Sequence, residues 1–349
     1  MKIAAISLFS GSGGLDLGCI MASVPVLLCI DNDPDCILTL KKNSHFMNTE
    51  IYQSDITSLP IDRYKNALSK YNPDKFIIIG GPPCQPFSKA GYWVGLGSRQ
   101  SYKDPRNMFD EFIRIIDNLR PDGFLMENVA SILHPVNRGA LAIIFDKITN
   151  LNYHYKLLNE SALSYGVPQK RQRLFIIASK RKIDLDEPNR THFSKREIEK
   201  NGLLVYENVG KFISKYDNPQ YFEREEVVSV ESRYSKELLA VPPGKNYLAL
   251  CKSNGHFSHR FKAGARYWHF LLKLSPDLPS WTISAQPGPW VGPFHWNNRR
   301  LRIPEIAAIQ TFPENYNFIG TRRSVQKQIG NAVPPLMAKA MLEFLKEII

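Results

Sequence analysis

A single cysteine, Cys84, lies between prolines in the stretch GGPPCQPFS, residues 80–88. The apolar run 76–79 just before this stretch has the length and composition of a buried strand. The glycines and prolines should end that strand in a stiff turn, which would hold the thiol at the carboxyl end of a strand. Cysteine is strongly nucleophilic near neutral pH once its surroundings favour the thiolate, so the pattern predicts a nucleophile. A buried cysteine in a structural turn is the alternative.

Three charged residues also lie next to predicted strands: Glu127 follows one strand, and Arg171 and Arg173 precede another. Glu127 comes directly after an apolar run, so it should lie at the same edge of the sheet as Cys84. A carboxylic acid there can protonate or hydrogen-bond a substrate ring while sulfur attacks the ring. In the segment QKRQR, residues 169–173, Arg171 and Arg173 project to one side and suit a carbonyl oxygen or a phosphate. The alternatives are a helix-start carboxylate and a surface strand end.

The turn FSGSGGLD, residues 9–16, lies between a predicted strand and a predicted helix. Its glycines would let a ligand approach the backbone amides of the helix N-terminus. The dinucleotide fingerprint GxGxxG fails, because its third glycine falls on Asp16. Asp31 ends the second predicted strand, where a carboxylate can accept both ribose hydroxyls, and Asp55 follows the third, where it could accept from an adenine amino group. Together these residues predict a nucleoside ligand without a pyrophosphate; a purely structural glycine turn is the alternative.

The elements that must position these residues indicate an α/β fold. Over residues 1–180, short apolar runs alternate with helical stretches, which is typical of a doubly wound, mostly parallel sheet. Residues 181–298 lose this alternation and should form a smaller, irregular domain. Residues 299–349 should return to the first domain. We expect strands at 3–9, 26–30, 76–79, 123–126 and 174–178, weaker strands near Ile51 and Tyr153, and helices after Asn107 and at 137–149, 304–310 and 335–349.

Charge favours a polyanionic partner, because the formal net charge is +12. Residues 251–273 mix basic and aromatic side chains without an Asp or Glu, and 170–182 are also basic without an acid. Such mixtures suit a phosphate backbone beside exposed bases, with a solvated basic face as the alternative. The odd number of cysteines and the lack of a CxxC pair argue against disulfides and against a metal site. No apolar run is long enough to span a membrane, so we expect a cytosolic protein.

The motifs described above belong to a series of sequence blocks whose order resembles that of the cytosine-C5 DNA methyltransferases of the bacterial restriction–modification type. The resemblance covers nearly the whole chain, with a variable stretch between QKRQR and the next block. The blocks that carry it are FSGSGG, Asp31, SDI (54–56), GPPCQPFS, ENV (127–129), QKRQR, RRLRIPEIAAIQTFP (299–313) and QIGNAVPP (328–335). It implies the Rossmann-like fold of class I methyltransferases that depend on S-adenosylmethionine, and DNA (cytosine-5-)-methyltransferase activity.

The resemblance also implies a mechanism. Cys84 would add to C6 of a flipped cytosine, Glu127 would contact N3 and the amino group, and Arg173 would hold O2, with Arg171 in the same catalytic set. The Pro82 carbonyl would accept from the exocyclic amine. Addition at C6 makes C5 nucleophilic, C5 takes the methyl group, and loss of the C5 proton expels the thiolate. The base must leave the duplex, because C6 lies inside the stack.

Binding residues follow from the same resemblance. The cofactor S-adenosylmethionine would be held by Phe9, Ser10, Gly11, Gly13, Gly14, Asp31, Asn32, Asp55, Ile56, Pro83, Asn331 and Val333. Asn32 departs from the large apolar residue that the family often has there. Residues 88–104 would close as a lid over the flipped base, and residues 181–298 would be the target-recognition domain. DNA contacts are expected from Ser88, Lys89, Arg99, Arg260, Arg266 and Gln286.

The implied partners are double-stranded DNA and a cognate restriction endonuclease that acts on the same site, and a monomer is expected. One alternative is a tRNA cytosine-C5 methyltransferase of the Dnmt2 kind, which has Cys-Phe-Thr after ENV where this chain has Ala-Ser-Ile-Leu. A catalytically silent DNA-binding homologue is disfavoured by the intact set of Cys84, Glu127, Arg171 and Arg173. A nicotinamide oxidoreductase is disfavoured by Asp16. The sequence gives neither the DNA recognition site nor the modified cytosine.

Overall fold

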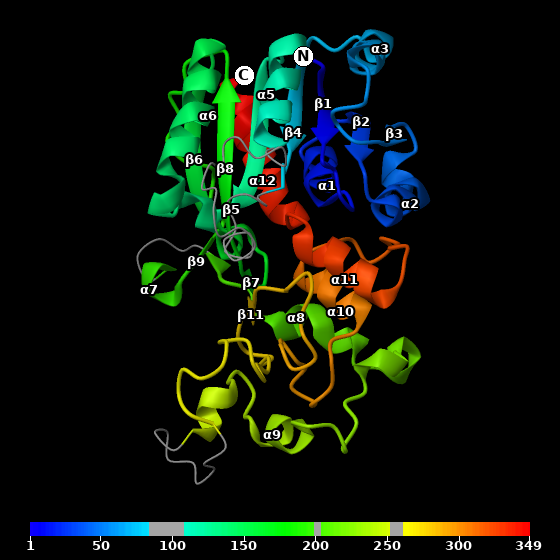
Figure 1. The fold of residues 1–349 in the computed structure, drawn as a ribbon, viewed down its shortest axis with the longest axis vertical. Coiled ribbons are helices and arrows are strands. Elements are labelled where there is room, and N and C mark those ends of the chain that lie inside the picture. The colour runs from blue at the N-terminus through cyan, green and yellow to red at the C-terminus, as the bar shows by residue number, and fades with distance from the viewer. Residues whose placement is uncertain (84–107, 199–203, 252–260) are drawn as a thin grey trace, which may run out of the picture.

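The computed structural model describes residues 1–83, 108–198, 204–251 and 261–349. Within these ranges a seven-stranded sheet has the order β3-β2-β1-β4-β5-β8-β6 (Figure 1). Strands β1 to β5 are parallel, whereas β8 runs antiparallel to both β5 and β6. The strands are β1 (Ile3–Leu8), β2 (Val26–Asp31), β3 (Glu50–Gln53), β4 (Lys75–Gly80), β5 (Gly123–Val129), β6 (His154–Ser161) and β8 (Gln172–Ser179). The predicted mostly parallel, doubly wound sheet is confirmed.

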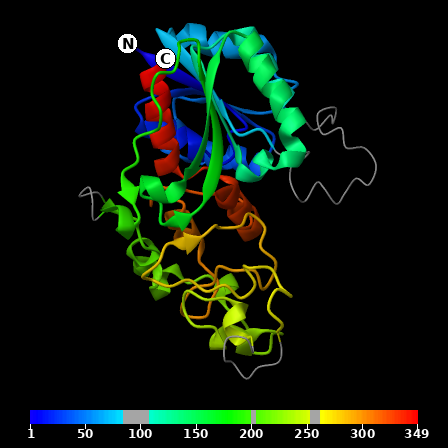
Figure 2. The ribbon, with the colours of Figure 1, turned by 90° about the vertical axis from the view of Figure 1, so that its left-hand side faces the viewer.

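The central strands of the sheet are buried on both faces, which explains why β1, β2 and most of β4 appear in the sequence as apolar runs. Along β4, Ile77 and Ile79 belong to one core cluster and Ile78 to the other. The first cluster includes residues of α1 (Gly14–Met21), α2 (Pro34–Lys42) and α12 (Pro335–Ile348), and the second includes residues of α3 (Ile61–Tyr71), α5 (Met108–Leu119) and α6 (Arg138–Asn150). Figure 2 shows α12 in red on one side of the sheet and the α5–α6 side opposite.

Strand β5 is longer than predicted, which corrects the position of Glu127. The apolar run was expected to end at residue 126, with Glu127 after the strand. In the structure β5 continues to Val129, because β8 pairs with it antiparallel as far as Val129 and Arg173. Glu127 is therefore a strand residue, and the strand partner fixes the direction of its side chain.

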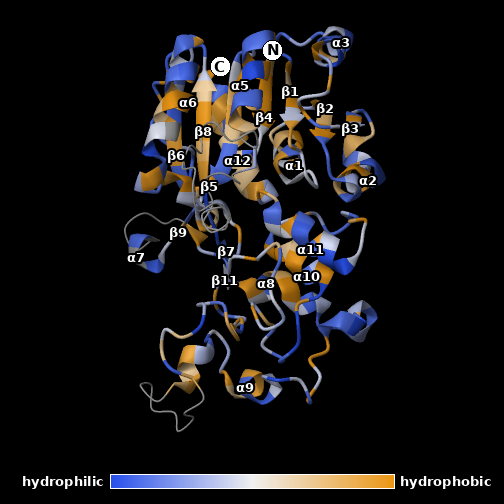
Figure 3. Cartoon of the chain, in the orientation of Figure 1, coloured by the Kyte–Doolittle hydropathy of each residue, from blue (hydrophilic) through white to orange (hydrophobic). Residues whose placement is uncertain are grey.

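Below the sheet the chain is less regular (Figure 1). Its short elements include β9 (His192–Phe193), α7 (Lys195–Ile198), β10 (Leu204–Val205), α8 (Val209–Ile213), α9 (Ser235–Ala240) and β11 (Ser280–Trp281). A separate apolar cluster that includes Tyr234, Tyr247 and Phe270 forms a core there. Figure 3 shows that hydrophobic colour is most continuous along the strands of the sheet and is broken up in the lower part. The boundaries at residues 181 and 298 stay a prediction.

The last part of the chain connects the lower region to the sheet. Helices α10 (Ile303–Ile309) and α11 (Arg322–Asn331) lie at the level between the two regions, and α12 packs beside α1 against the sheet (Figure 1). Pro304 occupies the first turn of α10, where its missing N–H costs no hydrogen bond. Within the described ranges, no helix is long and apolar enough to cross a membrane.

Candidate active site

Open α/β sheets have a crevice outside the carboxyl ends of the strands at which the strand order reverses, and here these strands are β1 and β4. Strands β2 and β3 lie on one side of β1, whereas β4 and β5 lie on the other, so the order reverses between β1 and β4. Ligands of open α/β sheets bind at such a switch point. The last paired residues of the two strands are Leu8 and Gly80. The glycine turn and the start of the GGPPC stretch therefore leave the sheet side by side.

The glycine turn is held by the acid that ends β2. The backbone N–H of Gly11 donates to Asp31 Oδ2 over 2.8 Å, and the N–H of Asp33 donates to Asp31 Oδ1 over 2.8 Å. Burial raises the pKa of the Asp31 carboxyl, and these two hydrogen bonds oppose the shift. Gly11 has a φ of 54°, and a Cβ there would meet no atom of the described residues within 4 Å, so these residues leave open space in front of the turn. A ligand can thus reach both the Gly11 backbone and the Asp31 carboxylate.

The QIGNAVPP block closes the same turn from the far end of the chain. A Cβ at Gly14 would lie 2.4 Å from the carbonyl oxygen of Val333, so only glycine allows this approach. Gly13 caps α1 with a φ of 82°. Val333 is buried, whereas Asn331 is exposed. Predicted cofactor residues from the start and from the end of the chain therefore lie next to each other, as Gly14 and Val333 show.

The other predicted cofactor residues differ in exposure. Asp55 is exposed, and its Oδ1 accepts from the hydroxyl and the N–H of Thr57, which lowers the pKa of the Asp55 carboxyl. Ile56 is buried next to it, while Asn32 and Pro83 are exposed. Asp55 is therefore a carboxylate of fixed orientation beside the crevice.

Two residues at the end of β1 complete this set. Phe9 has a φ of 55°, which is unusual for a bulky residue and often marks a functional turn. The Ser10 hydroxyl is buried and donates to Ser7 Oγ over 2.8 Å. The Ser10 N–H also donates to the Ile30 carbonyl oxygen over 3.1 Å, and the Ser10 carbonyl accepts from the Gly13 N–H over 3.0 Å, so Ser10 shapes the turn.

Glu127 and Arg173 form a nearly buried ion pair beside the crevice. Arg173 Nε lies 2.9 Å from Glu127 Oε1, and each side chain is 12% exposed. Glu127 is paired with Phe175 across β5 and β8, so Arg173 is its diagonal neighbour on the same face. Burial raises the pKa of Glu127, and the charges of Arg173 and Arg171 oppose that shift. A Cβ at Gly81 would lie 3.0 Å from Glu127 Oε2, so the pair adjoins the GGPPC stretch.

Arg171 is fully buried and connects two distant blocks. Its Nη2 donates to the carbonyl oxygens of Gly330 and Ala332 over 2.7 and 2.9 Å. Its Nε and Nη1 have no hydrogen-bond partner among the described residues. Burial lowers the pKa of Arg171, and the charge of Arg173 acts in the same direction. The side chain thus holds the turn that presents Asn331 while it places positive charge near Glu127.

Sequence reasoning missed several polar residues that support this site. Asn128 Nδ2 donates to the carbonyl oxygen of Pro82 over 3.0 Å, which fixes the peptide just before the predicted nucleophile. Gln169 Nε2 donates to Gln310 Oε1 over 3.0 Å, and Gln310 Nε2 donates to the Ile329 carbonyl over 2.7 Å. The signal was present, because each of these polar residues lies inside a recognised block.

Several predicted residues lie outside the described ranges. They are Cys84, Ser88, Lys89, Arg99 and Arg260, and the predicted lid at 88–104 lies there as well. Arg266 and Gln286 are described, and both are exposed in the lower region. The Arg266 guanidinium lies 5.4 Å from the centroid of the Phe270 ring.

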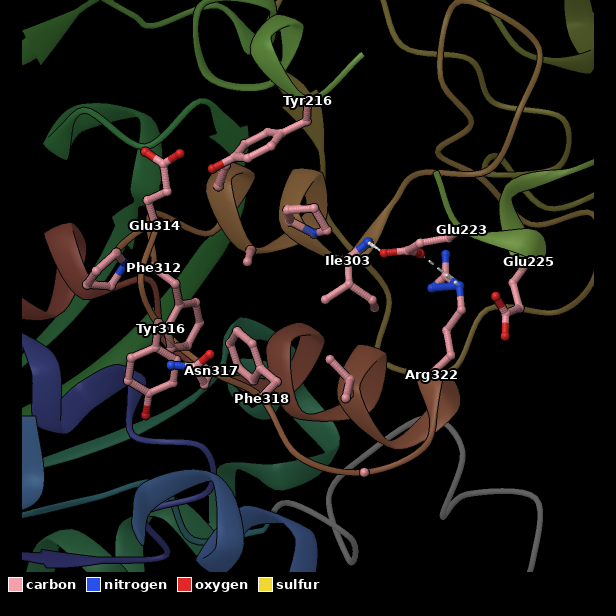
Figure 4. A pocket seen from close by; sticks show the side chains of 16 residues that line it. Tyr216, Glu223, Glu225, Ile303, Phe312, Glu314, Tyr316, Asn317, Phe318 and Arg322 are labelled. Carbon is pink, nitrogen blue, oxygen red and sulfur yellow. Dashed lines mark hydrogen bonds and ion pairs between the residues drawn. The ribbon is translucent and has the colours of Figure 1, made fainter. Parts of the chain in front are cut away.

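A separate cavity of about 400 Å³ lies between α10 and the start of α11 (Figure 4). Tyr216, Phe312 and Phe318 line it together with Glu223 and Arg322. Its lining contains none of the predicted catalytic or cofactor residues, so we do not assign the reaction to it.

The strand order and the crevice at β1 and β4 define the fold of a class I methyltransferase. The family model for C-5 cytosine-specific DNA methylases matches residues 3–347, and the chain belongs to this family. It is accordingly a DNA cytosine-5 methyltransferase, and the predicted family and enzyme class are confirmed.

Relatives and solved structures agree with this assignment. The Type II methyltransferase M.SacI of Streptomyces achromogenes is 34% identical over 99% of this chain and 93% of its own length. The Type II methyltransferase M1.HphI of Haemophilus parahaemolyticus is 31% identical over 98% of this chain and 86% of its own length. A prophage-encoded E. coli protein described as a DNA modification methyltransferase superposes with a TM-score of 0.67 at 24% identity, covering 99% of both chains. The structure of DNMT2 from Spodoptera frugiperda superposes with a TM-score of 0.61 at 18% identity, covering 99% of this chain and 100% of its own. Both structural matches show the fold alone.

Proposed function

We propose that this enzyme transfers a methyl group from S-adenosylmethionine to C5 of a flipped cytosine within a short, specific sequence of double-stranded DNA, through a covalent adduct between Cys84 and C6. The observation that carries the proposal is the Glu127–Arg173 pair. It is nearly buried, it lies beside the crevice of the sheet, and it adjoins Gly81 in the segment that leads to Cys84. A paired acid and guanidinium of this kind suit one edge of a pyrimidine ring.

The residues at the glycine turn fit a nucleoside cofactor. Asp31 presents a carboxylate to the open space in front of Gly11, which suits ribose hydroxyls, and Asp55 can accept from an adenine amino group. We assign Phe9, Asn331 and Val333 to the same site. The bound cofactor supplies an electrophilic methyl group. Family and fold support this choice, because methyltransferases of this fold in general use S-adenosylmethionine.

Glu127 and Arg173 would act on neighbouring atoms along one edge of the base. Burial raises the pKa of Glu127, so this carboxyl can hold a proton for N3 of cytosine more readily than an exposed one. Arg173 would donate to O2 and hold the Glu127 carboxyl in place. As the Cys84 thiolate bonds to C6, the C5–C6 π electrons become available at C5, and N3 takes the proton. C5 would then bond to the methyl carbon while the bond between that carbon and the cofactor sulfur breaks, and N3 would return its proton to Glu127. A base would remove the C5 proton, and the electrons of that C–H bond would re-form the C5–C6 double bond as the C6–S bond breaks and the Cys84 thiolate leaves.

Asn128 would prepare the acceptor for the exocyclic amine. Its side chain donates to the Pro82 carbonyl, and a carbonyl oxygen has a second lone pair. That lone pair can accept from the amino group of cytosine. Thymine carries a carbonyl oxygen at the same position and could not donate, so this contact would favour cytosine.

We further propose residues 181–298 as the target-recognition domain and a cognate endonuclease that cuts the same DNA site. The names of the relatives, which are Type II methyltransferases, support a restriction–modification role. Those names also favour DNA over tRNA as the substrate. A monomer and a cytosolic location stay predictions.

Covalent trapping tests the adduct. DNA made with 5-fluorocytosine should form a complex with the wild type that survives SDS and requires S-adenosylmethionine, because C5 cannot lose fluorine as it loses a proton. Cys84→Ala should form none and should still bind DNA. A stable complex with Cys84→Ala would contradict the assignment of the nucleophile.

A further inference from the structure

Residues 262–268 form a turn that is exposed along its whole length. Tyr267 is 86% exposed and Trp268 is 48% exposed, which is unusual for large aromatic side chains. The turn also carries Lys262 and Arg266 and contains no acid. Its exposed aromatic and cationic groups are therefore available to a partner.

Buried side chains hold this turn in one conformation. The Tyr247 hydroxyl accepts from the N–H of Gly264 over 3.1 Å and donates to the carbonyl oxygen of Arg266 over 3.0 Å. Asn246 Nδ2 donates to the carbonyl oxygen of Trp268 over 2.8 Å. Tyr247 itself is 2% exposed and packs edge-on against Phe270. The turn is thus a preorganised surface, which reduces the ordering entropy that binding would otherwise cost.

The same turn is joined to the arginine segment of the active site. The rings of Trp268 and Trp281 lie 5.4 Å apart at 61°, and Lys170 Nζ lies 4.4 Å from the Trp281 ring centroid. Trp281 in β11 is the strand partner of Lys170 in β7 (Gln169–Lys170), and the two strands lie together below the sheet (Figure 1). Lys170 is followed directly by Arg171. A partner bound on Tyr267 and Trp268 would therefore touch a chain of contacts that leads through Trp281 to the segment carrying Arg171 and Arg173.

We propose that Tyr267 and Trp268 stack on nucleobase faces that become accessible next to the flipped cytosine, and that Tyr247 and Trp281 are positioning residues for this contact. The inference rests on the proposed flipping of the base, because an intact duplex hides its base faces inside the stack. Aromatic rings stack on any base, and neighbouring cations contact the phosphates. Lys262, Arg266 and Lys170 supply these cations here. A protein partner would not explain why the aromatic pair is connected to the catalytic arginines.

The test compares Tyr267→Ala and Trp268→Ala with Phe222→Ala, a matched control. Phe222 is also exposed, at 59%, but it lies in a different segment of the lower region. After the methylated site has been mapped with the wild type, the dissociation constant for a duplex containing that site is measured by fluorescence anisotropy. Each turn variant should weaken binding about 5- to 100-fold, as expected for one lost stacking contact. Phe222→Ala should bind like the wild type, and all variants should bind S-adenosylmethionine and melt like the wild type.

Tyr247→Phe separates positioning from simple folding. This variant keeps the ring and loses the hydroxyl that bonds to Gly264 and Arg266. It should keep the rate with saturating cognate DNA, raise KM for that DNA, and methylate sites with one altered base pair relatively more often. Unchanged KM and unchanged discrimination would refute the positioning role.

The outcomes distinguish this inference from the proposed function. Wild-type DNA binding that persists unchanged in both Tyr267→Ala and Trp268→Ala refutes the inference and points to another partner for the turn. A wild type that neither binds DNA nor traps 5-fluorocytosine refutes the proposed function itself.

Discussion

Asp16 provides a quantitative test of the packing below the glycine turn. It lies in the first turn of α1 and is 0% exposed. Its Oδ1 accepts from the Cys29 thiol over 3.2 Å, whereas Oδ2 has no hydrogen-bond partner among the described residues. Burial raises the pKa of Asp16 from 3.8 to about 6. A carboxyl of this kind favours folding when it is protonated and disfavours folding when it is ionised.

The expected size of the effect follows from the shift. The folded state holds its proton up to about pH 6, whereas the unfolded state loses its proton near pH 3.8. The wild type should therefore lose about 3 kcal/mol of unfolding free energy as pH rises through this window, at about 1.4 kcal/mol per pKa unit. Asp16→Asn keeps an acceptor for Cys29 and has no charge to bury. The stability of this variant relative to the wild type should therefore increase with pH and level off above pH 7.

Urea unfolding at pH 5, 6, 7 and 8 measures this difference. About half of the 3 kcal/mol should develop between pH 5 and pH 8, because part of the titration occurs below pH 5. Thr39→Val, which removes a buried hydroxyl that does not titrate, is the control and should give a stability difference that does not vary with pH. A constant difference between Asp16→Asn and the wild type across this range would refute the raised pKa.

Three further results are expected. Glu127→Gln should lower the single-turnover methylation rate by at least about 100-fold, because it removes the proton that N3 would take; a full rate would exclude Glu127 from the chemistry. Arg173→Ala should lower the unfolding free energy by about 3 kcal/mol or more in urea, because it leaves the nearly buried Glu127 without its partner, and Glu127→Gln should cost less. The DNA dissociation constant should rise steeply with salt concentration in a titration from 50 to 200 mM through counterion release, and a flat response would contradict a basic phosphate-binding surface.

Much of the sheet could be predicted because its strands are buried on both faces. The apolar runs at β1, β2 and β4 require no knowledge of the rest of the chain. The end of β5 could not be placed, since Glu127 and Asn128 look like loop residues until β8 supplies their partners. Helix α11 was missed because its sequence RRSVQKQIGN is mostly polar, and only a few of its residues, such as Val325 and Ile329, are buried.

The candidate site could also be predicted only in part. Residue type and strand position identified Glu127 and Asp31 as candidates for one edge of the sheet, whereas Arg173 reaches that edge because β8 runs antiparallel to β5. The contacts of Arg171 with Gly330 and Ala332 could not be predicted, because they join segments about 160 residues apart in the chain. Such long-range contacts depend on how α12 returns to the sheet, and no local pattern encodes them.

The proposed function depends on Cys84 as the nucleophile. Bisulfite sequencing of genomic DNA from a methylase-deficient host tests it most directly, with one culture expressing the wild type and one expressing Cys84→Ala. Protected cytosines are expected within one short motif in the first culture and none in the second. Protection that persists with Cys84→Ala, or no protection by soluble, folded wild type, would contradict it.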